Sequence, residues 1–238
     1  GFCCSVAAGG FVFDPKAFYD PIANRFFVVA LELNEGSSIS KILVAVSDDS
    51  NPTGTWYKYR IEAKQNVNGT DTWLDYPGWA GTKDGVVCNG HQFAFGGGFR
   101  AASVIVISKA QLLTGGAPTV NYFLDNGFTI QPARTGDPAV DRIYAASELN
   151  NNSLKLYAIT NLASSPVITT TSLTVPTYSN PSGPAASAGG NVLDTLPFRI
   201  MNAYWRGGKM GAKHTVARRP GSSDALGRRY ENNTNSWP

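Results

Sequence analysis

Four segments of the chain share an opening pattern, and the regular distance between them constrains the fold more than any other feature. Each segment has an aspartate next to or shortly before a proline: Phe13-Asp14-Pro15, Leu74-Asp75-Tyr76-Pro77, Gly136-Asp137-Pro138 and Leu193-Asp194-Thr195-Leu196-Pro197. The aspartates are 61, 62 and 57 residues apart. After each aspartate come short runs rich in β-branched and aromatic residues, separated by Gly, Pro, Asn and Asp, as is typical of strands and turns. The sequence therefore predicts a repeated unit of three or four strands.

A unit of about 60 residues with three or four strands has the size of a long β-propeller blade. A single blade cannot bury both of its faces, so blades stack on one another around an axis. We therefore expect an all-β chain that forms one β-propeller domain over residues 1–238, with at least four blades at about 11–70, 71–133, 134–190 and 191–238. Two closures remain open. Either residues 1–10 complete the last sheet as a closing strand of a four- or five-bladed ring, or the chain is part of a larger propeller of up to seven blades.

Composition agrees with this fold. Charged residues make up only 16% of the chain, only five residues are Glu, and Gly and Pro number 25 and 14. Solvated helices need the opposite balance. Within the repeat, the four aspartates are expected to cap the turn that enters the first strand of each blade, where Pro fixes the following backbone angle. This predicts a structural role for Asp14, Asp75, Asp137 and Asp194.

The net charge of +3 is unevenly distributed, because residues 198–238 hold eight basic and two acidic side chains. Such a tail is compatible with binding to a polyanion. Nucleic-acid binding is not expected, because these charges gather in one corner without interleaved aromatic residues. No apolar run approaches the ~20 residues of a membrane-spanning helix.

The cysteines predict a disulfide that joins Cys88 to either Cys4 or Cys3. No metal site is expected, because zinc would need a Cys or His cluster that the sequence lacks. Calcium could be held only at Asp48 and Asp49, whose spacing fits a capped hairpin turn better than a calcium loop. No other cofactor is predicted.

Few Lys and Glu, many Asn, Thr and Ser, and a possible disulfide favour a secreted or cell-surface protein.

Several segments, taken in order, carry a resemblance to a known class of proteins. They are Phe13–Pro21, Val46–Trp56, Trp73–Pro77, Ile107–Leu113 and Arg199–Ala203 with His214-Thr215-Val216. This ordered set resembles secreted bacterial β-propeller proteins of uncharacterised function, and the resemblance implies a fold and export but no chemistry.

More distantly, two of these segments are similar to stretches of five-bladed glycoside hydrolases. That similarity implies Asp14 as base, Asp75 as the carboxylate that orients and tunes, and Glu148 as acid, in a funnel where two carboxylates face each other across a sugar ~5–9 Å apart. Two departures weaken it: the aspartates recur in every unit, and Glu148 lacks the Gly/Ala-Pro context that follows the acid in those enzymes.

Two functional hypotheses follow. The first is a secreted or surface-displayed propeller that acts without catalysis as a binding, adhesion or structural module. Its partner would be an extracellular glycan or protein, or further copies of itself, and Trp73, Trp79 and Trp205 are its candidate carbohydrate-stacking platform. The alternative is a glycoside hydrolase or lyase acting on a polysaccharide, which requires Asp14, Asp75 and Glu148 to converge in one pocket.

Overall fold

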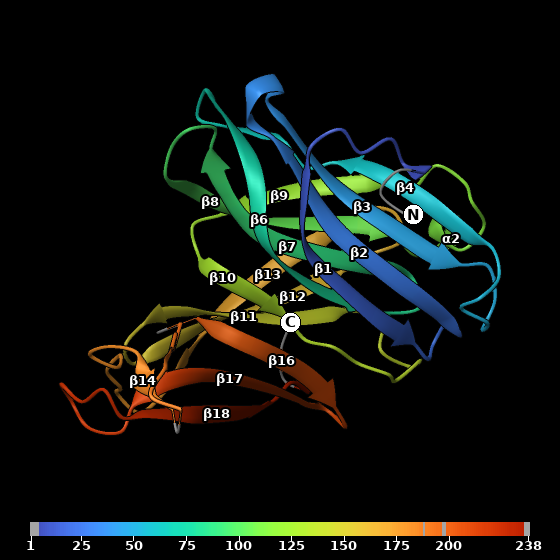
Figure 1. Ribbon diagram of the computed structural model, residues 1–238. Coiled ribbons are helices and arrows are strands. Elements are labelled where there is room, and N and C mark those ends of the chain that lie inside the picture. The colour runs from blue at the N-terminus through green and yellow to red at the C-terminus, as the bar shows by residue number, and fades with distance from the viewer. Residues whose placement is uncertain (1–4, 188, 197–198, 236–238) are drawn as a thin grey trace.

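Four antiparallel sheets make up nearly all of the computed structural model, which describes residues 5–187, 189–196 and 199–235. Figure 1 shows the sheets arranged one after another in chain order. Blade 1 consists of β1 (Phe11–Asp20), β2 (Arg25–Asn34), β3 (Ile39–Ser47) and β4 (Trp56–Glu62). Blade 2 consists of β5 (Gln65–Val67), β6 (Thr70–Gly81), β7 (Gly85–Ala94), β8 (Phe99–Ser108) and β9 (Val120–Asp125).

The second half of the chain repeats the plan with shorter sheets. Blade 3 consists of β10 (Phe128–Pro132), β11 (Ile143–Asn150), β12 (Ser153–Thr160) and β13 (Val167–Thr174), and blade 4 of β16 (Ile200–Arg206), β17 (Lys209–Ala217) and β18 (Ala225–Asn233). The remaining elements are the 3-10 turn η1 (Glu35–Ser37), the four-residue helix α2 (Lys109–Leu112) and the small ribbon of β14 (Ala185–Ala186) and β15 (Val192–Leu193). The predicted all-β propeller with four blades is confirmed.

Apolar side chains between neighbouring blades hold the sheets together. The cluster between blades 1 and 2 includes Phe27, Val44 and Ile105, that between blades 2 and 3 includes Val104 and Ile159, and that between blades 3 and 4 includes Leu156 and Met210. Burial of one such aliphatic or aromatic side chain contributes ~1.5–3 kcal/mol. Blade 2 packs on both sides, which explains why β7 and β8 are buried almost throughout rather than alternating.

The second and third sheets begin earlier than the aspartate pattern predicts, and the fourth begins later. They span residues 11–62, 65–125, 128–174 and 200–233. The structure therefore corrects the expected limits of 11–70, 71–133, 134–190 and 191–238: β5 belongs to blade 2, and β10 to blade 3.

The four aspartates do not occupy equivalent places, which corrects the prediction of one repeated turn. Asp14 lies inside β1, and Asp75 lies inside β6. Asp137 lies between β10 and β11 and accepts the N–H of the residue two positions on at 2.9 Å, and Asp194 does the same after β15 at 2.9 Å. An aspartate side chain can accept the N–H two residues on in many kinds of turn. An Asp-Pro pattern can therefore recur in a sequence without occupying equivalent positions in the fold.

A β-bulge within the innermost strand is what recurs in every blade. The bulges fall between Phe13 and Lys16 in β1, Asp75 and Gly78 in β6, Phe128 and Gln131 in β10, and Ile200 and Asn202 in β16. In the first three, the residues with positive φ are Asp14 (48°), Tyr76 (55°) and Thr129 (53°). A bulge redirects side chains without demanding one residue type.

The segment before β1 lies along blade 1. The N–H groups of Gly9 and Gly10 donate to Oε1 of Glu32 on β2 at 2.8 and 3.1 Å, and a Cβ on Gly10 would overlap the backbone of Leu33. Residues 5–10 form no strand, so the closing-strand prediction is wrong for them, and residues 1–4 lie outside the described part. In the part of the chain that is described, no helix is long and apolar enough to cross a membrane.

Candidate ligand-binding cleft

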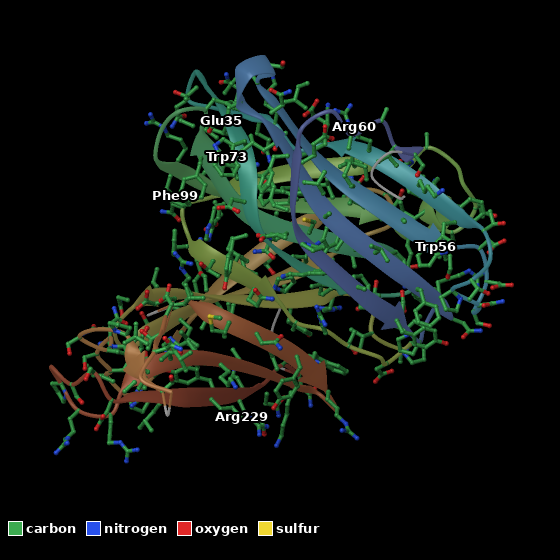
Figure 2. The ribbon with its side chains drawn as sticks, viewed as in Figure 1. Glu35, Trp56, Arg60, Trp73, Phe99 and Arg229 are labelled. Carbon is green, nitrogen blue, oxygen red and sulfur yellow. The ribbon has the colours of Figure 1, made fainter. Side chains whose placement is uncertain are left out.

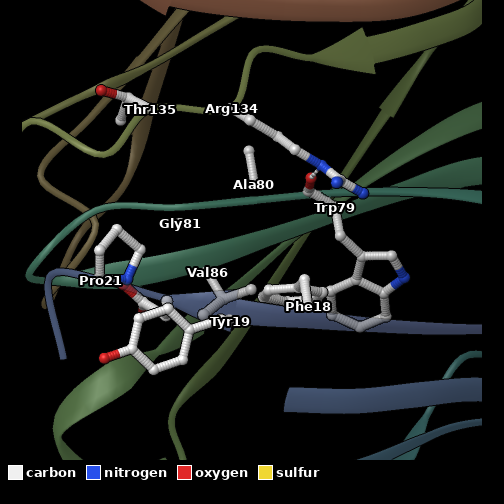
Figure 3. A pocket seen from close by; sticks show the side chains of 10 residues that line it. Phe18, Tyr19, Pro21, Trp79, Ala80, Gly81, Val86, Arg134 and Thr135 are labelled. Carbon is white, nitrogen blue, oxygen red and sulfur yellow. Dashed lines mark hydrogen bonds between the residues drawn. The ribbon is translucent and has the colours of Figure 1, made fainter. Parts of the chain in front are cut away.

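Three adjoining hollows at the carboxyl ends of the innermost strands share one residue, Arg134. Their volumes are about 90, 490 and 360 Å³. The first lies between blades 1 and 2 and is lined by Phe18, Trp79 and Val86 among others (Figure 3). The other two lie along blade 4, on either side of Tyr204. We call the three hollows together the Arg134 cleft.

The backbone fixes Arg134 although it follows the last residue of β10. Its N–H donates to the carbonyl of Ala203 at 3.1 Å, its carbonyl accepts from the N–H of Trp205 at 2.8 Å, and the residue forms a parallel bridge with Tyr204. These bonds extend the innermost strand of blade 3 against that of blade 4. The guanidinium therefore projects from a fixed point into the cleft.

The charge of Arg134 has no acidic partner. Its Nε donates to the carbonyl of Trp79 at 3.4 Å, and its guanidinium carbon lies 5.7 Å from the ring centre of Phe18. Figure 3 shows the guanidinium reaching over Trp79. Within the described residues, no carboxylate oxygen lies within 4.0 Å of it. The side chain is exposed, so its remaining N–H groups are open to a ligand.

A second cation, Lys16, lies near enough to Arg134 for their charges to interact. Lys16, on β1, is half-buried, and its Nζ donates to the carbonyl of Pro77. Burial lowers the pKa of Lys16, and the positive charge of Arg134 lowers it further. Two neighbouring cations that destabilise each other provide a favourable place for an anion.

Blade 4 adds further cations and aromatic rings to the lining. The cationic residues are Arg206 in one hollow and Lys213 and Arg229 in the other. The acidic residues that line the cleft are Asp137 in the second hollow and Asp20 in the first. Figure 2 labels Arg229 on blade 4; its guanidinium pairs with Glu231 at 2.6 Å and lies 5.3 Å from the ring centre of Tyr204.

The opposite end of the innermost strands carries a different set of groups. Asp75 is half-buried; burial raises its pKa, and the nearby charge of Asp14 raises it further. The guanidinium of Arg199 lies 5.3 Å from the ring centres of both Tyr76 and Phe128. This end combines two interacting carboxylates with one guanidinium on aromatic faces.

A buried histidine supports the aromatic faces under Arg199. The ring of His91 stacks on Phe128 with centroids 4.3 Å apart and on Tyr76 at 5.6 Å. Burial, together with the charge of Arg199, lowers its pKa to about 4. Its Nε2 accepts the N–H of Thr129 at 3.0 Å, so the ring is neutral at pH 7 and acts as a fixed support.

Two of the three carboxylates of the hydrolase hypothesis interact with each other in the structure. Asp14 and Asp75 interact electrostatically. Glu148 lies on β11 and accepts the hydroxyl of Tyr178 at 2.7 Å, and burial raises its pKa. Because Tyr178 belongs to the core between blades 3 and 4, Glu148 has a separate set of contacts.

The three tryptophans predicted as a platform do not share one surface. Trp73, labelled in Figure 2, packs between Phe13 and Phe93 with ring centroids 6.1 and 5.5 Å apart. Trp79 lies six residues further along β6, which is roughly 20 Å in an extended strand. It is 2% exposed and lines the first hollow. Trp205 lines the second hollow, and its Nε1 donates to Thr234 at 2.9 Å.

Cys88 forms no disulfide within the described residues; its thiol is fully buried, and burial raises its pKa. Cys3 and Cys4 lie outside the described residues, so the Cys4–Cys88 or Cys3–Cys88 disulfide stays a prediction.

At the calcium candidate, the carboxylate of Asp49 accepts the N–H of Asn51 at 2.6 Å, as in a capped turn. Over the described ranges, no three His, Cys, Asp or Glu side chains cluster as metal ligands would.

Sequence reasoning missed Arg134. It stands in Pro132-Ala133-Arg134-Thr135-Gly136, a segment that matches no motif. Its place in the cleft depends on how the ends of four strands meet in the folded chain. The one available signal was indirect: the excess of basic residues after position 198, several of which line the same cleft.

No protein family model and no curated protein matches the sequence. Among solved structures, the chain is similar to a subtype N11 neuraminidase-like protein of A/flat-faced bat/Peru/033/2010 (H18N11), at 10% identity and a TM-score of 0.44, over 90% of this chain and 59% of that one. It is also similar to the Pyrococcus horikoshii acylaminoacyl peptidase, at 13% identity and a TM-score of 0.30, over 87% and 43%. The chain thus spans less than two thirds of either protein, and at these TM-scores the likeness carries no function.

Proposed function

We propose that this chain is a secreted or surface-displayed binding module that holds an acidic polysaccharide in the Arg134 cleft. One observation carries the proposal: an exposed guanidinium with no carboxylate partner among the described residues lines all three hollows. A guanidinium presents its N–H groups as a rigid fork that matches a carboxylate or sulfate in a two-point contact.

Electrostatics favour an anion over a neutral ligand. The positive charges of Lys16 and Arg134 repel each other, and Arg206 and Lys213 add positive charge along blade 4. A bound anion would reduce this repulsion, because opposite charges within ~4–6 Å stabilise each other.

Aromatic rings in the cleft favour a sugar over a small inorganic anion. Tyr204 and Trp205 line the two larger hollows, and both side chains are only half-buried. Flat aromatic rings with a polar end are suited to contact a ligand that is apolar on one face and hydroxylated at its edge. The volumes of about 490 and 360 Å³ fall within the ~300–1,000 Å³ of ordinary ligand sites.

Calorimetric titration with polygalacturonate, dextran sulfate and neutral dextran tests the proposal. We expect the two acidic polymers to bind, neutral dextran not to bind, and Arg134→Ala to weaken binding at least tenfold. Arg100→Ala is the matched control, because it removes another exposed guanidinium, from blade 2. Equal affinities of Arg134→Ala and Arg100→Ala for the acidic polymers, or no binding to either polymer, would refute the proposal.

A second candidate function rests on Asp14 and Asp75. Two neighbouring carboxyl groups, one with a pKa raised by burial, are the arrangement that glycoside hydrolysis uses for its acid and base. This hydrolase function predicts release of reducing sugar from a polysaccharide by the wild type and its loss in Asp75→Asn. Unchanged release by Asp75→Asn, or no release by the wild type across acidic and neutral polysaccharides, excludes this function at these residues.

A further inference from the structure

The outermost strand of blade 3, β13, differs from the other three outermost strands in charge. Within the described sheets, β4 carries Lys58, Arg60 and Glu62, β9 ends in Asp125, and β18 carries Arg228, Arg229 and Glu231. The sequence of β13 is VITTTSLT, with no charged residue and no proline. Charges and prolines on an edge strand are what normally prevent it from pairing with another chain.

The geometry of β13 also suits pairing. Its eight residues pair with β12 in one continuous register, from Thr160↔Val167 to Ser153↔Thr174, without a bulge. Five of the eight residues are exposed, and the apolar Val167 is 48% exposed. A regular edge of this kind presents alternate N–H and C=O groups that have no partner within the sheet.

We propose that β13 pairs antiparallel with β13 of a second copy of this chain, about a twofold axis at Thr170. Side chains opposite each other in an antiparallel pair lie on the same face, so the two residue numbers of each pair must have the same parity. With Thr170 at the axis, Val167 faces Leu173 of the second copy, and Thr169 faces Thr171 of the second copy. The Thr170 residues face each other.

This register is self-complementary. It sets Val167 against Leu173 at both ends and threonines against each other in the middle, while Ile168 faces Ser172. Matched side chains directly opposite each other stabilise an antiparallel pair. It also joins seven residues of each strand through roughly six backbone hydrogen bonds. A second copy supplies this match by symmetry, whereas an unrelated peptide would have to carry the same pattern. The resulting interface is isologous, as in most homodimers.

Charge substitutions at positions 169 and 171 test both the pairing and its register. Dimerisation of the full chain is measured by sedimentation velocity over a range of concentrations. In the double variant Thr169→Lys/Thr171→Lys, like charges face each other at both pairs, and we expect the dimer dissociation constant to rise at least tenfold. Thr169→Glu/Thr171→Glu should do the same.

Two further samples restore the pairing. In Thr169→Glu/Thr171→Lys, each Glu faces a Lys of the second copy, so we expect a dissociation constant within about threefold of the wild type. An equimolar mixture of the Lys/Lys and Glu/Glu variants should form mixed dimers for the same reason. Unfolding midpoints of all variants show whether the chains remain folded.

The outcomes separate clearly. A wild-type chain that stays monomeric at all concentrations overturns the proposal. A Glu/Lys variant that remains folded but fails to dimerise also overturns the proposal, because in the proposed register each Glu would face a Lys of the second copy. The Arg134 cleft lies at the innermost strands, so polygalacturonate binding should be unchanged in all of these variants.

Discussion

A buried ion pair between Lys109 and Asp20 ties blade 1 to blade 2, and its removal gives the sharpest test of the packing. Lys109 begins α2, after the fourth strand of blade 2, and Asp20 ends β1. Their side chains are 0% and 9% exposed. The Nζ of Lys109 also donates to the carbonyl of Thr82, and Asp20 accepts the N–H of Ile22 at 2.9 Å. The pair therefore connects segments of two blades inside the protein.

The expected cost follows from burial. Asp20→Asn leaves the ammonium of Lys109 fully buried without a counter-charge, which destabilises a protein by ~3–5 kcal/mol. In the double variant Asp20→Asn/Lys109→Met, neither buried charge remains, so we expect the loss to be at least ~2 kcal/mol smaller than the sum of the two single losses. Glu62→Gln is the control, because it removes the partly exposed pair with Lys41, where solvent screening limits the loss to ~1 kcal/mol or less.

Urea unfolding followed by tryptophan fluorescence measures these differences. With a slope of about 3 kcal/mol per molar urea, Asp20→Asn should lower the midpoint by about 1 to 1.7 M, and Glu62→Gln by about 0.3 M or less. Additive losses in the double variant, or a shift for Asp20→Asn no larger than for Glu62→Gln, would show that the two blades are not joined by this pair.

Three further predictions concern single residues. The hydrogen bonds of Arg60 hold the pKa of the buried Glu32 below its usual value. The destabilisation caused by Glu32→Gln should therefore be constant above about pH 5 and should shrink as the pH falls below about 4. Urea midpoints measured from pH 3 to 7 check this. Burial raises the pKa of Asp75, so ionisation costs stability at neutral pH: Asp75→Asn should raise the urea midpoint at pH 7, and the difference should vanish near pH 3. Gly211→Ala would add a Cβ that overlaps the ring of Tyr204. Under the proposed function it should weaken polygalacturonate binding, measured by calorimetry. Gly227→Ala on the neighbouring strand should weaken that binding less.

The fold could be predicted from the sequence because its signals are local. Short β-branched runs and Gly, Pro and Asn turns mark each strand within a few residues, and their regular recurrence marks the blades. The blade limits failed because the prediction was anchored on aspartates. Asp137 and Asp194 cap ordinary turns, whereas Asp14 and Asp75 lie in strands, and sequence spacing alone cannot distinguish these two environments.

The site depends on contacts between distant segments, so little of it could be predicted. The interaction of Asp14 with Asp75 follows from their similar positions in the innermost strands of blades 1 and 2. The role of Glu148 rests on the resemblance alone, and its hydrogen bond with Tyr178 in the core between blades 3 and 4 joins segments that no sequence motif connects. No sequence motif marks Arg134. Among the described residues no carboxylate pairs with its guanidinium, and that can be seen only in the folded chain.

The two ends of the innermost strands differ in charge, and this difference decides how a ligand would approach. At one end Asp14 and Asp75 lie with Arg199, and at the other Arg134 stands with the cations of blade 4. Lys16 lies between them and interacts with both Asp14 and Arg134. Under the proposed function, an acidic polymer is therefore attracted to the Arg134 end and repelled by the two carboxylates at the opposite end. A hydrolase acting at Asp75 would need its substrate at that opposite end, so for an acidic polysaccharide the binding and hydrolase functions place the ligand at different ends of the axis.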